Sequence, residues 1–128
     1  MSAPGGAGSE FNGHLEAHQG AVRLTLEGKL DQREPEKFLR PLLARLHDLA
    51  ASTKAGSVEI DLTALEVMNS AAVRAVLAYI GSVQVMVGHR YGVRFVITSA
   101  RRWQGPTVNA VKAWGGDFIE IATTSPAT

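Results

Sequence analysis

One segment of the chain, residues 57–88, constrains the fold more than any other. At 58–62 apolar and acidic residues alternate, which is the period of a strand with one buried side. A polar pair, Asn69 and Ser70, then precedes apolar residues that recur at helical spacing, which predicts a helix over 70–88. A strand followed in this way by an amphipathic helix is the unit from which parallel sheets are built.

The rest of the chain repeats the alternation of strand and helix. Further strands are expected at 15–17, 21–26, 91–98 and 118–121, and further helices at 35–50 and 106–114. Gly28 is expected to end the strand that begins at 21. Because alternating strands and helices need crossover connections, the sequence predicts an α/β fold with a single, mostly parallel β-sheet of four to five strands covered by about three α-helices.

The two ends of the chain lack this pattern. Residues 1–13 are rich in Gly, Ala, Ser and Pro, and we expect a disordered tail there. Residues 123–128 are expected to form a second, flexible tail, so that the domain spans 14–122. No run of about 18 apolar residues is present, and the first residues do not resemble a secretion signal. A cytoplasmic protein that does not insert into membranes is therefore expected.

Composition and motifs argue against several kinds of function. The chain has no cysteine, and its net charge is only +1 without a basic stripe, so neither a thiolate site nor a nucleic-acid partner is expected. His14, Glu16 and His18 do not match the zinc-protease motif, because the glutamate comes one residue late, and on a strand they would share one exposed face. No phosphate-binding loop or nucleophile elbow occurs. We expect no catalytic residues, no metal and no cofactor, and thus no enzyme.

Two short motifs resemble those of a known family. Residues 22–31 (VRLTLEGKLD) resemble the strand ending in Gly-x-Leu-Asp that begins a STAS domain, the fold of bacterial anti-sigma factor antagonists. Residues 58–70 (VEIDLTALEVMNS) resemble the family's strand, Asp-Leu-Ser loop and Asp-Ser segment. The similarity covers roughly residues 20–122. The matching positions are Gly28, Leu30 and Asp31 in the first motif, and Asp61 and Leu62 in the second.

The resemblance implies a regulatory domain that binds protein partners. In this family a serine at the start of the second helix is phosphorylated by a kinase that is often also an anti-sigma factor, and a metal-dependent serine/threonine phosphatase removes the phosphate. Ser70 is the residue at that position. Asn69 stands where the family has aspartate, and asparagine caps a helix about as well.

The helix that begins at Ser70 is the expected partner surface. A phosphate on Ser70 would meet the free N–H groups and the positive end of the helix dipole, and Arg74, one turn further on, could hold it. Trp103 follows two arginines and is expected as an exposed interface anchor, whereas Trp114 is expected in the core. The predicted partner-binding residues are Gly28, Leu30, Asp31, Asn69, Ser70, Arg74, Ala78, Ser82 and Trp103.

Three functions are compatible with these features. The first is a partner-switching domain that binds a protein kinase or anti-sigma-type ATPase and is switched by phosphorylation of Ser70. The second is a constitutive scaffold or homodimer in which Asn69 marks a lost switch. The third is a nucleotide or small-ligand binder that uses the helix N-terminus.

Overall fold

The strand and helix patterns of the sequence assemble into one sheet with three helices. The structure is a computed structural model that describes residues 11–86 and 90–124. Its elements, in chain order, are β1 (Asn12–His18), β2 (Ala21–Leu30), α1 (Glu36–Ser52), β3 (Ser57–Met68), α2 (Ser70–Gln84), β4 (Gly92–Thr98), α3 (Gln104–Gly115) and β5 (Ile119–Thr124). The sheet has the order β1-β2-β3-β4-β5, with β1 antiparallel to β2 and all other neighbours parallel. The predicted α/β class and the mostly parallel sheet are confirmed.

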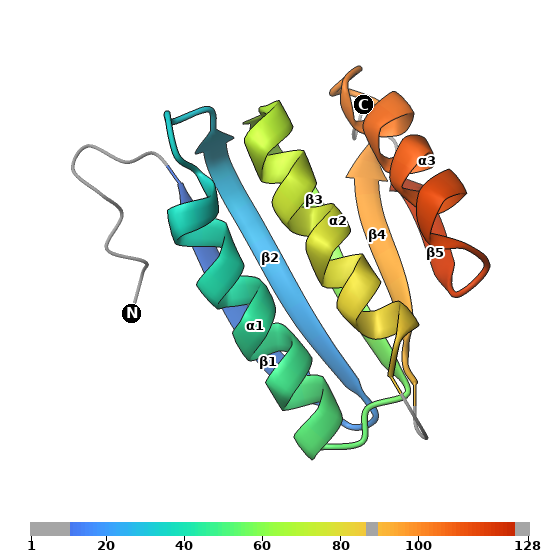
Figure 1. The fold of residues 1–128 in the computed structure, drawn as a ribbon. Helices are drawn as coiled ribbons and strands as arrows, with labels where there is room; N and C mark the ends of the chain where they lie inside the picture. Colours follow the sequence, from blue (N-terminus) through green and yellow to red (C-terminus); the bar gives the residue numbers. More distant parts are fainter. Residues whose placement is uncertain (1–10, 87–89, 125–128) are drawn as a thin grey trace.

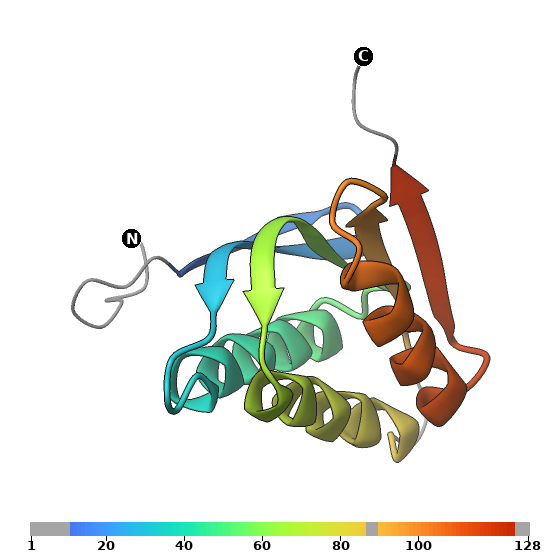
Figure 2. The same ribbon diagram turned by 90° about the horizontal axis from the view of Figure 1, so that it is seen from above.

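All three helices cover the same face of the sheet. Figure 1 shows α1, α2 and α3 in front of the strands, and Figure 2 shows the two layers from above. The reason is the strand order: from β2 to β5 each new parallel strand is added on the same side of the previous one. Crossover connections are right-handed, so a sheet that grows in one direction places every connecting helix on one face.

The core lies between the sheet and this helix layer. Inward-facing strand residues such as Leu24, Ile60 and Phe95 are in register across neighbouring strands and are buried. Leu46 of α1 and Ile80 of α2 are buried against them. The alternation of apolar and polar residues in each strand therefore corresponds to one covered and one open face.

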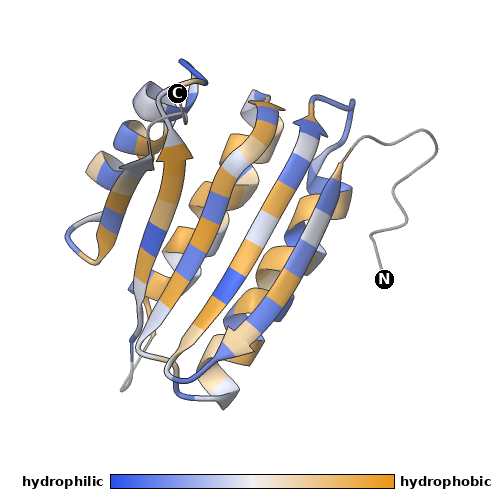
Figure 3. Ribbon diagram, turned by 180° about the vertical axis from the view of Figure 1, so that it is seen from behind, coloured by the Kyte–Doolittle hydropathy of each residue, from blue (hydrophilic) through white to orange (hydrophobic). Residues whose placement is uncertain are grey.

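The open face of the sheet carries many hydrophilic residues, blue in Figure 3, and among them is a row of alternating charges. One residue from each strand contributes, in register across the sheet: Glu16, Arg23, Glu59, Arg94 and Glu120. The closest oxygen and nitrogen atoms of Arg23 and Glu59 lie 3.1 Å apart, and those of Arg94 and Glu120 lie 3.4 Å apart. Opposite charges directly across strands each stabilise a sheet by roughly 0.2–1 kcal/mol. Glu59 can therefore occupy a central strand without entering the core.

Several element boundaries differ from those predicted. Phe11 was assigned to the tail but is 3% exposed, and β1 begins at Asn12, because this short strand pairs along its whole length with β2. β5 continues to Thr124 through its pairing with β4. Residues 1–10 and 125–128 of the two predicted tails lie outside the described residues. Gly28 does not end β2, since its φ of +89° lies within a register irregularity that the pairing with β3 spans.

Candidate functional site

The two sequence motifs meet where the neighbouring strands β2 and β3 end, at the carboxyl ends of the parallel strands. Leu30 and Met68, the last residues of these strands, are paired. The backbone N–H of Asn69 donates to the Leu30 carbonyl at 2.9 Å. The loop after β2 and the start of α2 therefore form one continuous surface, although they lie far apart in the sequence.

Asn69 stabilises this junction with both the oxygen and the nitrogen of its side-chain amide. It is the N-cap of α2, and its Oδ1 accepts a hydrogen bond from the Ala72 amide at 3.0 Å. Its Nδ2 donates to the Gln32 carbonyl at 3.0 Å. An aspartate could make the first bond but has no hydrogen for the second. The structure thus gives a physical reason for asparagine at this position, where the family that the sequence resembles has aspartate.

Ser70 is the first residue of α2 and its side chain is exposed. Within the described part of the chain its hydroxyl has no hydrogen-bond partner, since the capping bond is made by Asn69. A substituent on this oxygen would not disturb the cap. Such a group would also lie beside the N–H groups of the first helical turn, which have no acceptor inside the helix.

Three further predicted residues follow Ser70 along the exposed side of α2. Arg74, Ala78 and Ser82 succeed it at intervals of four residues, and all three are exposed. Arg74 forms no ion pair with any described residue, and Ser82 donates only to the Ala78 carbonyl, at 3.3 Å. We name these four residues, Ser70, Arg74, Ala78 and Ser82, the α2 row.

The residues of the first motif have unequal positions. Asp31 is exposed and Gly28 is half-buried, but the Leu30 side chain is fully buried. Leu30 was predicted to contact a partner. Its side chain lies in the core, so that prediction is wrong for the side chain. What Leu30 contributes to the site is its carbonyl, which anchors Asn69.

The two tryptophans are placed in the opposite way to the prediction. Trp103 is half-buried and packs against the core, with its indole nitrogen buried, whereas Trp114 is 54% exposed. The cause is the start of α3 at Gln104: its buried side consists of Gln104, Val108, Val111 and Gly115. This register turns Trp114 outward, and Trp103 is not an exposed anchor.

Gln104 is an important residue for which the sequence offers no distinguishing signal. Its side chain is fully buried, and its Oε1 accepts a hydrogen bond from the Thr98 amide at 2.9 Å. Its Nε2 donates to the carbonyls of Leu62 and Leu65 at 2.6 and 3.1 Å. The pairing of β3 with β4 ends at Asp61, so this amide takes the place of a strand partner along the part of β3 that leads to Asn69.

Asp61, a residue of the second motif, fixes β3 on its open face. Its carboxylate accepts hydrogen bonds from the Thr63 amide at 2.9 Å and the Thr63 hydroxyl at 2.7 Å, and it pairs with Arg23. Burial raises the pKa of Asp61, but the bonds from Thr63 and Arg23 together outweigh this and hold the pKa below its ordinary value. Asp61 is thus a structural residue beside the bend that leads to the site.

Replacing Asp61 with asparagine is expected to lower the free energy of unfolding by about 1–2 kcal/mol at neutral pH, because the ion pair is lost while an acceptor for Thr63 is kept. Since the folded-state pKa lies below the ordinary value of 3.8, the stabilisation is complete above that value and is lost as the pH falls through the folded pKa. In urea titrations followed by circular dichroism, the difference between variant and wild type should therefore shrink below about pH 4. Glu59→Gln is the control: its pair with the same arginine is more exposed and should contribute less than about 1 kcal/mol.

The described residues include no group of three or more histidine, aspartate or glutamate side chains placed to hold a metal. His14, Glu16 and His18 lie on the open face of the sheet, with Glu16 opposite Arg23. None of the described helices is both long enough and apolar enough to cross a membrane.

Comparison with known proteins identifies the fold. No family model and no curated protein matches the sequence. The structure, however, resembles the crystal structure of an anti-sigma factor antagonist from Mycobacterium paratuberculosis, with a TM-score of 0.62, covering 97% of this chain and 92% of that one at 17% sequence identity. The STAS-like architecture predicted from the two motifs is thereby confirmed as the fold of this chain.

Proposed function

We propose that the chain is a non-enzymatic regulatory domain of the anti-sigma factor antagonist type, which binds a protein partner through the α2 row and the loop at Asp31. The partner would be a kinase or anti-sigma-type ATPase that phosphorylates Ser70, with a serine/threonine phosphatase as the enzyme that restores binding. The observation that carries this proposal is the exposed hydroxyl of Ser70, which has no hydrogen-bond partner among the described residues. It lies at the start of a helix whose cap is made by the neighbouring Asn69.

The rest of the surface supports partner binding by α2. Ala78 and Ser82 are small, so the backbone of another helix could approach closely there. A phosphate on Ser70 would add roughly −1.5 to −2 charges at one end of this flat surface. Arg74 lies one turn away and forms no ion pair among the described residues, so it is available for that phosphate. A partner that contacts unmodified Ser70 would then face both a new charge and a reoriented arginine.

Ser70→Asp is expected to weaken partner binding roughly tenfold or more, a loss of at least about 1.4 kcal/mol, whereas Ser70→Ala should bind like wild type. The measurement is affinity capture from the source cells with the wild type and each variant as bait, followed by identification of an ATPase of the kinase type and of phosphate on Ser70 by mass spectrometry. Ser57→Asp is the matched control. It adds the same charge at the first residue of β3, at the end of that strand opposite to the one that leads to Ser70.

Undiminished capture of that ATPase by Ser70→Asp would count against a switch at this residue. Capture that is equal for every variant, with no phosphate on Ser70, would instead favour the constitutive scaffold. Calorimetry with adenine and guanine nucleotides tests the third function, a nucleotide bound at the start of α2.

A further inference from the structure

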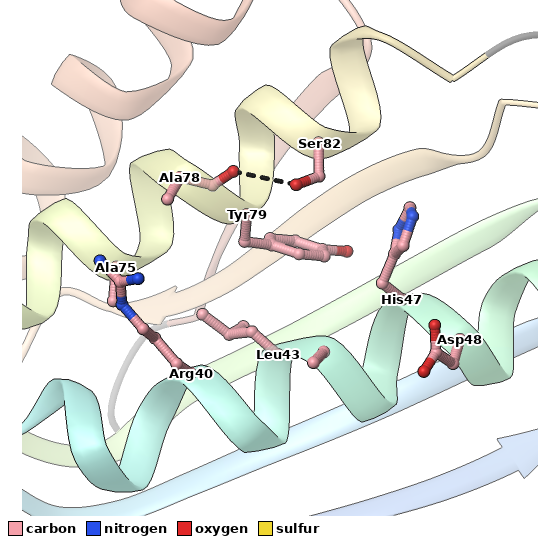
Figure 4. A pocket seen from close by; sticks show the side chains of 9 residues that line it. Arg40, Leu43, His47, Asp48, Ala75, Ala78, Tyr79 and Ser82 are labelled. Atoms are coloured by element: carbon pink, nitrogen blue, oxygen red, sulfur yellow. Dashed lines mark hydrogen bonds between the residues drawn. The ribbon is translucent and has the colours of Figure 1, made fainter.

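A groove runs between α1 and α2, with a volume of about 230 Å³ (Figure 4). Its walls come from Arg40, Leu43, Ala44, His47 and Asp48 of α1 and from Ala75, Ala78, Tyr79 and Ser82 of α2. It lies on the outer surface of the helix layer, where the described chain places nothing over it. The groove is therefore a candidate contact surface distinct from the phosphate site at Ser70.

Hydrogen bonds hold the aromatic part of the groove in place. His47 Nδ1 lies 2.7 Å from the Tyr91 hydroxyl, which lies 3.0 Å from the Tyr79 hydroxyl. Burial raises the pKa of both tyrosines, that of Tyr91 to about 12, so both hydroxyls stay protonated at neutral pH. The groove is thus already formed in the isolated chain.

One edge of the groove carries two opposite charges at equal distances from a small central residue. Arg40, Ala44 and Asp48 follow one another at intervals of four residues on α1, and all three are exposed. Neither Arg40 nor Asp48 forms an ion pair with another described residue. Ala44, the midpoint, has the smallest side chain that still favours a helix, so a second helix can approach closely there. A row of this spacing is the ridge used in the commonest class of helix packing.

We propose that a second copy of this chain packs on the groove in an antiparallel, two-fold arrangement centred on Ala44. A two-fold axis at the midpoint places Arg40 of each copy beside Asp48 of the other, because both lie about 6 Å along the helix from Ala44. Two equivalent ion pairs then form across the axis. A helix of an unrelated protein requires no such equality of spacing, whereas a two-fold contact does.

The inference of a dimer does not rest on the proposed phosphorylation of Ser70. Ala78 and Ser82, however, line the groove and also belong to the α2 row. The second copy would cover part of the surface proposed for the partner, so that dimer and partner complex exclude each other.

The test is the oligomeric state of the full chain by sedimentation equilibrium, with three charge variants in the row and one control charge variant outside it. Arg40→Asp and Asp48→Arg should each raise the dimer dissociation constant by about tenfold or more, since each places like charges together twice in one dimer. The double variant Arg40→Asp/Asp48→Arg should return the constant to near the wild-type value. Arg45→Asp, an exposed charge reversal outside the groove on the same helix, should leave it unchanged.

Each other outcome overturns the proposal. A wild type that stays monomeric at several hundred micromolar excludes the dimer, and single variants that dimerise like wild type place the contact elsewhere. A double variant that remains monomeric excludes the two-fold pairing. Far-ultraviolet circular dichroism of every variant shows that these changes on the surface of α1 leave the fold intact. None of these measurements involves Ser70, so their failure is distinct from failure of the partner switch.

Discussion

Replacing Gln104 with leucine is expected to lower the free energy of unfolding by roughly 3 kcal/mol or more, and substitutions at this position should have the largest effects in the described part of the chain. The side chains have similar volumes, so packing changes little. What is lost is three hydrogen bonds at once: those to the Leu62 and Leu65 carbonyls and the one from the Thr98 amide. Each of these buried backbone groups would be left without a partner, at a cost of about 1–3 kcal/mol. Urea denaturation followed by tryptophan fluorescence and circular dichroism measures the loss.

Two further variants make this result specific. Gln104→Glu keeps an acceptor for the Thr98 amide. When ionised, however, the buried carboxylate has no hydrogen for the two carbonyls and repels them, so this variant should destabilise at least as strongly. Asn109→Leu is the matched control, since this exposed residue of α3 makes one hydrogen bond, to the Gly105 carbonyl at 2.8 Å, and should change stability by less than about 1 kcal/mol. A loss below about 1 kcal/mol for Gln104→Leu would show that water or backbone movement replaces the amide.

The second large effect is expected at Asn69. Asn69→Ala removes both the cap on the Ala72 amide and the bond to the Gln32 carbonyl, and should lower the free energy of unfolding by about 2 kcal/mol. Asn69→Asp keeps the cap and adds a charge that the helix dipole favours, so only the bond to Gln32 is lost. Its expected cost is about 1 kcal/mol or less. The difference between the two variants separates the capping of α2 from its attachment to the loop after β2.

Ser70→Ala is the control for this pair, because the exposed hydroxyl has no partner among the described residues and its removal should be nearly neutral for stability. Hydrogen exchange adds a local measurement: in Asn69→Ala the amide of Ala72 should lose protection, and in Asn69→Asp it should not. Equal stability of the alanine and aspartate variants would contradict a capping function for Asn69.

The sequence carried enough information for the sheet and for the exposed side of α2. Strand and helix periods gave the order of the elements, and the spacing of Ser70, Arg74, Ala78 and Ser82 correctly placed them on an exposed helix face. Both signals are local, because they depend only on the repeat of one helix or strand.

Other features depend on contacts between distant segments and could not be predicted in this way. Leu30 was predicted to contact a partner because it belongs to the first motif, yet strand pairing turns its side chain into the core. The positions of Trp103 and Trp114 depend on where α3 begins, and helix ends are poorly defined by periodicity. The sequence around Gln104, which follows Arg102 and Trp103, does not distinguish it from a surface glutamine. Only the gap that opens where β3 leaves β4 gives Gln104 its buried position.

The pairing of Leu30 with Met68 also bears on when the candidate site comes into existence. Its two parts meet only after the parallel strands β2 and β3 have aligned, with the whole of α1 between them. Pairing of this kind closes a long loop and is slow relative to the formation of a single helix. A chain still emerging from the ribosome therefore displays Ser70 as part of a linear peptide before it displays the assembled surface. An enzyme or partner that recognises the assembled surface would therefore act only on the folded protein, so folding would have to be complete before recognition.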